Sequence, residues 1–202
     1  MQVLWSVMTM KTAAWFFGIG AMLFLFCAYQ QKERKNLLLC KLGADICWAI
    51  HYGLLGASGG AIPNIVGIFR ESVFVNRKKG NRADRIIWPI AFAAANLSLG
   101  VAMMKSYIDL LPLVSSALVT VSLWLKDPRI TKIISLPVSC AFLVYDVFAG
   151  SYIGVINESL AIVSILTSVV KTVLLRIGEK ADGKASAVGI ADSSAKTKER
   201  SR

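Results

Sequence analysis

The chain has 202 residues, a hydrophobic content of 55% and a formal net charge of +11. Apolar runs of 18 or more residues recur with few charges, which excludes an ordinary water-soluble domain and indicates a polytopic membrane protein. The basic residues lie between the apolar runs and in the last part of the chain. Membrane topology and anionic lipid explain this distribution better than a nucleic-acid partner does.

Seven hydrophobic segments are expected to form transmembrane helices. They cover residues 12–30, 36–56, 60–76, 86–104, 108–126, 130–149 and 153–176. The stretch 179–202 is small, polar and charged, a composition typical of disorder. We therefore expect an all-α membrane protein, with a seven-helix domain in residues 1–178 and a disordered basic cytoplasmic tail in residues 179–202.

The basic residues predict the orientation of these helices. Most of the 23 lysines and arginines fall in connections 32–35, 77–85 and 126–132 or in 171–202, all on one side of the membrane. The opposite side carries only Lys11 and Lys105. Since cytoplasmic loops carry the excess of positive charge, we expect an external N-terminus, a cytoplasmic C-terminus and an odd number of spans. The cytoplasmic basic face is expected to contact anionic lipid.

An internal repeat is visible when the chain is shifted by 94 residues. The shift aligns Gly56 with Gly150 and Gly60 with Gly154 without a gap, and it preserves orientation. It carries repeat 1, about 12–76, onto repeat 2, about 108–176, and leaves a linker helix at 86–104. This pattern predicts two parallel three-helix bundles in a 3+1+3 plan, in which a transported solute would bind near mid-membrane between the repeats.

The second and third segments contain more polar residues than is usual for a transmembrane helical hairpin. Their polar residues are Lys41, Asp45, His51, Asn64, Arg70 and Glu71. Each charge held in hydrocarbon costs roughly 2.5–3.5 kcal/mol on insertion scales, so a hairpin with four charges must pair them, hydrate them or use them.

Helix geometry predicts which of these charges meet. At 1.5 Å per residue, Lys41 and Glu71 both lie roughly 7 Å inside the cytoplasmic edge, and Asp45 and Arg70 lie deeper. Opposite charges therefore match at two levels, and we predict the ion pairs Asp45–Arg70 and Lys41–Glu71. Two interpretations stay open. The ion pairs only neutralise one another and stabilise the hairpin, or Arg70 binds a carboxylate or phosphate of a solute.

Further polar and aromatic residues are candidates for the same central site. His51 is expected near the height of Asn64, and Trp48 could stack on a ring, although a satisfied histidine and a packing tryptophan are the plainer interpretations. In repeat 2, Asp146 and Glu158 are candidate proton-coupling residues, because a carboxylate pair deep in a bundle resists double ionisation. The alternative is that both stay hydrated near the outer surface.

Signatures of catalysis and of cofactor binding are missing from the sequence. It contains no phosphate-binding loop, no His-Glu-x-x-His and no Gly-x-Ser-x-Gly. One histidine and four cysteines without close spacing leave little for a metal site. We expect no enzyme activity and no cofactor.

The stretch LGADICWAIHYGLLGASGGAIPNIVGIFRESVFVNR resembles the bacterial inner-membrane YgjV family. The resemblance covers the seven segments and implies a place in the bacterial inner membrane, and kinship with the SWEET and PQ-loop group of small transporters. That group shares the 3+1+3 plan with an external N-terminus and a cytoplasmic C-terminus. The run Pro63-Asn64-Ile-Val-Gly67 looks like the Pro-Asn-x-x-Gly of a SWEET third helix, where the asparagine faces the substrate cavity, which by analogy gives Asn64 that role.

The chain departs from the SWEET pattern in two places. It contains no Pro-Gln dipeptide, and the repeat partner of Asn64 is Glu158, with Asn157 one residue earlier. The symmetric asparagine pair is therefore broken, which suggests an ionisable partner.

These observations predict a SWEET-like carrier for a small polar solute such as a sugar, a sugar acid or a nucleoside, with proton coupling left open. Its predicted substrate-binding residues are Asn64, Arg70, Asp45, His51, Trp48, Asn157 and Glu158. The alternative is a structural scaffold in the inner membrane that transports nothing. A homo-oligomer is left open, and no nucleic-acid partner is expected.

Overall fold

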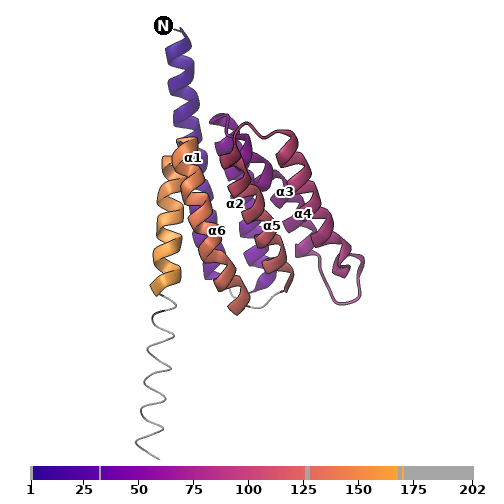
Figure 1. Ribbon diagram of the computed structural model, residues 1–202. Coiled ribbons are helices and arrows are strands. Elements are labelled where there is room, and N and C mark those ends of the chain that lie inside the picture. Colours follow the sequence, from indigo (N-terminus) through magenta and orange to yellow (C-terminus); the bar gives the residue numbers. More distant parts are fainter. Residues whose placement is uncertain (1, 32, 126–127, 168–169, 171–202) are drawn as a thin grey trace, which may run out of the picture. The chain divides into compact units, whose positions relative to one another are not determined.

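The computed structural model describes residues 2–31, 33–125, 128–167 and 170, and within these ranges every regular element is helical (Figure 1). The long helices are α1 Gln2–Gln30, α2 Arg34–Leu54, α3 Ser58–Val75, α4 Ile87–Ala102, α5 Leu110–Leu125, α6 Pro128–Ala149 and a seventh, unlabelled helix Tyr152–Thr167. Two short 3-10 turns, η1 Arg82–Asp84 and η2 Tyr107–Asp109, lie in the connections around α4.

Each predicted hydrophobic segment corresponds to one of these helices. The main difference at the start is that α1 reaches back to Gln2 instead of beginning near residue 12. The last part of the seventh segment and the predicted tail at 179–202 lie outside the described residues. Within the described residues, three helices are long and apolar enough to cross a bilayer, namely Thr9–Ala28, Arg34–Leu54 and Tyr107–Leu125. The chain divides into two compact parts, residues 1–162 and residues 163–202. The features described below belong to residues 1–162.

Neighbouring helices pack against one another along the chain. Helix α2 packs against α1 and α3, while α5 packs against α3, α4 and α6. The inward stripe of α1 consists of small residues at helical spacing, with Ala14, Ala21 and Ala28 almost fully buried. Small residues let two helix backbones approach closely, which is how helices associate inside a membrane.

Large apolar side chains cover the outside of the bundle. Phe16, Phe69 and Phe148 are 75%, 63% and 70% exposed. The buried set, in contrast, includes the polar residues Asp45, His51, Arg70, Glu71, Asn96 and Asp146. An apolar exterior around a polar interior is the reverse of a water-soluble fold and suits lipid as the surrounding solvent.

The turns after α2 and α6 have the same geometry. Gly56 and Gly150 end these helices with φ of +68° and +67°, a left-handed conformation that glycine adopts without strain. After α2, the amide of Gly56 donates to Gly53 and the amide of Ala57 donates to Tyr52. After α6, Gly150 donates to Val147 and Ser151 donates to Asp146, which is the same Schellman motif. Each pair of equivalent positions is separated by the repeat spacing.

Candidate functional site

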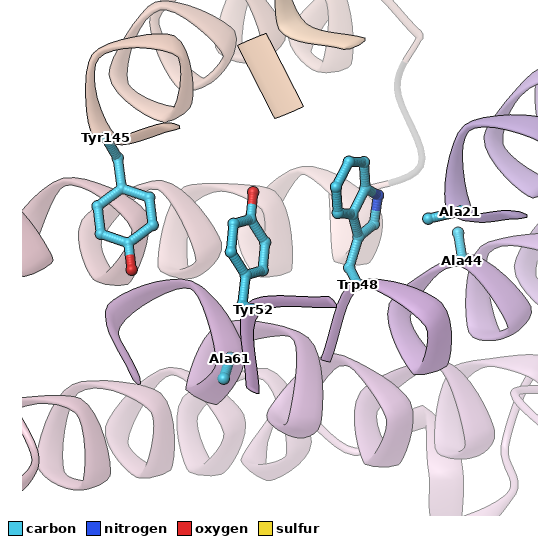
Figure 2. Packing of buried hydrophobic residues seen from close by; sticks show 6 residues of the cluster. All are labelled: Ala21, Ala44, Trp48, Tyr52, Ala61 and Tyr145. Carbon is cyan, nitrogen blue, oxygen red and sulfur yellow. The ribbon is translucent and has the colours of Figure 1, made fainter. Parts of the chain in front are cut away.

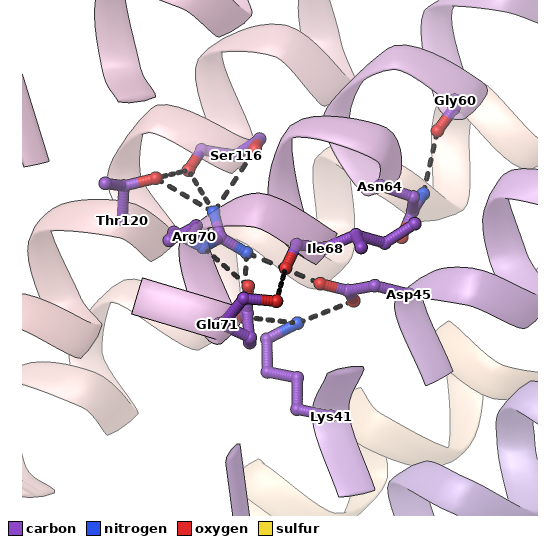
Figure 3. Close-up of polar contacts among 10 residues, drawn as sticks. Lys41, Asp45, Gly60, Asn64, Ile68, Arg70, Glu71, Ser116 and Thr120 are labelled. Carbon is purple, nitrogen blue, oxygen red and sulfur yellow. Dashed lines mark hydrogen bonds and ion pairs between the residues drawn. The ribbon is translucent and has the colours of Figure 1, made fainter. Parts of the chain in front are cut away.

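Four charged side chains from α2 and α3 form one buried cluster (Figure 3). Lys41 and Asp45 are one turn apart on α2, and Lys41 Nζ lies 2.9 Å from Asp45 Oδ1 and 3.5 Å from Glu71 Oε1. Arg70 Nη2 lies 3.1 Å from Glu71 Oε1 and 3.8 Å from Asp45 Oδ2. The structure thus brings together both pairs that helix geometry predicted, Asp45–Arg70 and Lys41–Glu71.

The charge cluster is deeply buried and formally neutral. Arg70 is 2% exposed and Glu71 is 0% exposed. Two cations oppose two anions, so each charge has a partner in a place where an isolated charge would cost several kcal/mol. Asp45 Oδ2 accepts no hydrogen bond within the described residues and lies against Gly67 of α3. A side chain at position 67 would displace this carboxylate.

Helix α5 supplies a third wall of the cluster. Arg70 Nη1 donates to Thr120 Oγ1 at 2.8 Å and to the Ser116 carbonyl at 3.4 Å. Thr120 Oγ1 in turn donates to the Ser116 carbonyl at 2.8 Å. The guanidinium therefore connects α3 to α5, and two residues that sequence reasoning missed become part of the site. Their signal was present in the sequence, since α5 carries four small polar residues among apolar ones, namely Ser115, Ser116, Thr120 and Ser122.

A second polar contact joins α2 to α6. The Tyr52 hydroxyl donates to Asp146 Oδ1 at 2.7 Å, and these two positions are separated by the repeat spacing of 94 residues. Asp146 is 1% exposed, and its Oδ2 has no hydrogen-bond partner within the described residues. Gly154 and the Ser151 hydroxyl lie beside Oδ2.

His51 ties three helices together. Its Nδ1 lies 2.7 Å from the Ala14 carbonyl of α1, and its Nε2 lies 2.8 Å from Ser151 Oγ. Since a carbonyl only accepts, Nδ1 carries the hydrogen and Nε2 accepts from Ser151, whose oxygen also accepts from the Gly154 amide at 3.1 Å. Both ring nitrogens are occupied, so the plainer interpretation of His51 as a satisfied buried histidine fits this geometry.

Aromatic rings of α2 and α6 form a row inside the bundle (Figure 2). Trp48 stacks on Tyr52 with ring centroids 5.5 Å apart, and Tyr52 meets Tyr145 edge-on at 6.0 Å. The Tyr145 hydroxyl accepts a hydrogen bond of 2.7 Å from the Gly60 amide. Trp48 is therefore packed against Tyr52 and His51 in this structure.

Among the remaining predicted residues, Asn64 and Asn157 each form a hydrogen bond within their own helix. Asn64 donates to the Gly60 carbonyl of its own helix at 2.7 Å and stays half-buried. Asn157 donates to Glu158 Oε1 at 2.9 Å. Glu158 also pairs with Ser139 and lies within electrostatic reach of Lys41. In the described part of the chain, no hydrogen bond joins Asn64 to Asn157 or Glu158.

Three residues of this network escaped the sequence reasoning altogether, besides Ser116 and Thr120. They are Tyr52, Ser139 and Ser151. Tyr52 could have been found from the repeat itself, since it aligns with Asp146. The residues described contain no group of three histidine, cysteine or carboxylate side chains that could hold a metal ion.

Comparison with known proteins gives a family. The family model described as "Bacterial inner membrane protein", Imp-YgjV, matches residues 12–175. No curated protein matches the chain. No solved structure matches it either.

Proposed function

The chain belongs to the Imp-YgjV family of bacterial inner membrane proteins, and we propose that it is a SWEET-like carrier for a small polar solute. In this proposal, the helices within 12–76 and 108–176 form two three-helix units around the linker helix, and the solute crosses between them. Candidate solutes are a sugar, a sugar acid or a nucleoside.

One observation carries this proposal: polar side chains of α2, α3 and α6 form hydrogen bonds across the proposed boundary between the two three-helix units. These bonds are Tyr52–Asp146, His51–Ser151, Arg70–Thr120 and Tyr145–Gly60. Apolar packing also crosses this boundary, since Leu113 of α5 lies in one buried cluster with Ile62, Val66 and Phe74 of α3. Polar contacts that open and close against water are what a carrier with alternating access requires.

The pairing of Tyr52 with Asp146 suggests how the units move. These residues occupy equivalent positions in the two repeats, so in a parallel duplication their contact would lie close to the axis that relates the units. Rocking about such a contact changes the width of the space on either side of it. We propose that this bond holds the structure closed at one end and breaks when that end opens.

Proton linkage is the second part of the proposal. Asp146 offers a buried carboxyl beside the hydroxyls of Tyr52 and Ser151, and Glu158 lies within its electrostatic reach. Uptake of one proton would neutralise the carboxyl during closure, and its release would accompany opening. The basic connections 32–35, 77–85 and 126–132 are proposed to face the cytoplasm and its anionic lipid, with the N-terminus outside.

The alternative function is that of a scaffold, and the charge cluster favours it. Lys41, Asp45, Arg70 and Glu71 neutralise one another, and His51 has partners for both ring nitrogens. In this view the polar interior only specifies how the helices pair.

Reconstitution into liposomes separates the two functions. We expect uptake of at least one labelled sugar, sugar acid or nucleoside, with a rate that responds to an imposed pH gradient. Asp146→Asn should abolish the response to the gradient, because an amide cannot exchange the proton. Glu33→Gln, at an exposed carboxylate just before α2, is the matched control and should behave as the parent protein.

The scaffold would be favoured by one result. If the folded protein moves none of the three solute classes with or without a pH gradient, the carrier proposal is wrong.

A further inference from the structure

A pocket of about 240 Å³ opens at the end of the bundle where α2 and α6 terminate. Its walls come from the turn between α2 and α3, from η2, and from the last turn of α6. The lining residues are Ala57, Ser106, Ile108, Asp109, Tyr145, Phe148 and Ala149. This volume is below the roughly 300–1,000 Å³ of pockets for drug-sized ligands, so the ligand that fits is small.

Asp109 gives the pocket its chemical character. It is 8% exposed, and Oδ2 accepts hydrogen bonds from the amides of Lys105 at 2.8 Å and Ser106 at 3.1 Å. Within the part of the chain that the structure describes, Oδ1 accepts none. One oxygen of a buried carboxylate is therefore available to a ligand that donates hydrogen bonds.

The rest of the lining suits a cation. Phe148 and Tyr145 place aromatic rings at the pocket, and ring faces attract ammonium groups. The C-terminal end of α6 contributes the negative end of a helix dipole. At the same end of the bundle, Lys105 Nζ donates to the Gly56 carbonyl at 3.0 Å, and no ion pair between Lys105 and Asp109 is found within the described residues.

In the first repeat, the position equivalent to this pocket is occupied by a side chain. A shift of 94 residues places Tyr145 on His51, Asp109 on Trp15 and Ala57 on Ser151. There, the His51 ring occupies the space between the Ala14 carbonyl and Ser151 Oγ, with hydrogen bonds to both. The second repeat has an open pocket and a carboxylate in the place of that closed contact.

We propose that this pocket binds a small organic cation through a primary ammonium group, with Asp109 as its counter-ion and the rings of Tyr145 and Phe148 beside its apolar part. The pocket borders the Tyr145–Gly60 bond of the proposed carrier, but binding of the cation can be measured without transport.

The test is the thermal unfolding midpoint of the full-length protein in detergent, titrated with propylammonium chloride. We expect a saturable rise in the midpoint, because a ligand of the folded state stabilises it by mass action. Sodium chloride at equal ionic strength and 1-propanol at equal concentration should produce no such rise. A rise of the same size with either of them would overturn the proposal.

Three variants sharpen this experiment. Asp109→Asn keeps an oxygen for the backbone amides but loses the charge, and should raise the half-maximal concentration roughly tenfold or more. Ala149→Leu narrows the pocket without removing a polar group and should also suppress the response. Asp84→Asn, on a distant connection, should leave it intact. An undiminished response in both pocket variants contradicts the assignment, even if one of them unfolds more easily at the start.

Discussion

Individual charged residues in this protein are stabilised by partners from different helices. Arg70 illustrates this, since its guanidinium contacts Glu71 beside it, Asp45 on α2 and Thr120 on α5. A lysine could not reproduce this set, because an ammonium is a compact charge without the planar fork of a guanidinium. The energetic consequence is that removal of one charge leaves the others unbalanced in a dry environment.

A double-mutant cycle on the charge cluster measures this consequence. We expect Glu71→Gln to reduce the free energy of unfolding by about 3–5 kcal/mol, because Arg70 then keeps a buried, under-compensated charge. Adding Arg70→Met to Glu71→Gln should recover part of this loss, since Lys41 and Asp45 remain as a balanced pair. The free energies of unfolding of the single and the double variant are measured by unfolding the purified proteins with a denaturing detergent.

Glu33→Gln serves as the control for this cycle, because Glu33 is an exposed carboxylate just before α2. Its effect should stay within about 0.5 kcal/mol. Purely additive losses for the Arg70 and Glu71 substitutions would show that the two charges are not coupled.

Among the helices, the recurring feature is the pair of turns after α2 and α6. Both use a left-handed glycine and the same two backbone hydrogen bonds, so the chain reverses in the same way at two equivalent points. Each turn carries its polar neighbours to the same height, Tyr52 before one and Asp146 before the other. The geometry of the turn therefore determines that these two side chains can meet.

Glycine substitutions at the two turns should reduce the free energy of unfolding by similar amounts. We expect Gly56→Ala and Gly150→Ala each to reduce the free energy of unfolding by about 1–2 kcal/mol, because a side chain disfavours the left-handed conformation. Gly53→Ala is the control, since Gly53 lies within α2 and a methyl group there meets no atom within 4 Å. This change should be neutral or slightly stabilising. A loss at Gly53 as large as at Gly56 would refute the conformational explanation.

At the scale of the whole molecule, the distribution of apolar and polar side chains between surface and interior is reversed relative to a water-soluble protein. Exposed phenylalanines such as Phe69 face outward, whereas Asp45 and Asp146 are buried. Only lipid around the bundle makes this distribution favourable, in agreement with the family of bacterial inner membrane proteins to which the chain belongs. The orientation proposed from the positive charges then decides which end of the bundle meets the cytoplasm.

Cysteine labelling tests that orientation. In a variant without Cys27, Cys40, Cys47 and Cys140, we expect Met103→Cys, between α4 and α5, to react with an impermeant thiol reagent in spheroplasts. Lys79→Cys, between α3 and α4, should react only after the membrane is permeabilised, because its connection is strongly basic. Both positions are exposed, so accessibility within the protein does not differ. The reverse pattern would place the N-terminus in the cytoplasm.

Local patterns in the sequence were sufficient to predict the number and order of the helices and the matching of charges within one hairpin. Hydrophobic length defines a helix, and the rise per residue places Asp45 opposite Arg70 once the two helices are antiparallel. These properties depend on residues that are close in the chain. The candidate site inside a hairpin is therefore readable before any coordinates are known.

Contacts between distant helices were decided only by the tertiary structure. The bonds from Arg70 to Thr120 and from His51 to Ser151 depend on how each helix is rotated about its axis, and apolar surfaces of similar composition do not specify that rotation. Asn64, which the resemblance to a SWEET third helix suggested as a site residue, stays a prediction, and its amide donates to the Gly60 carbonyl of its own helix. Periodicity along one helix determines which residues share a face, whereas close packing between helices determines what that face meets.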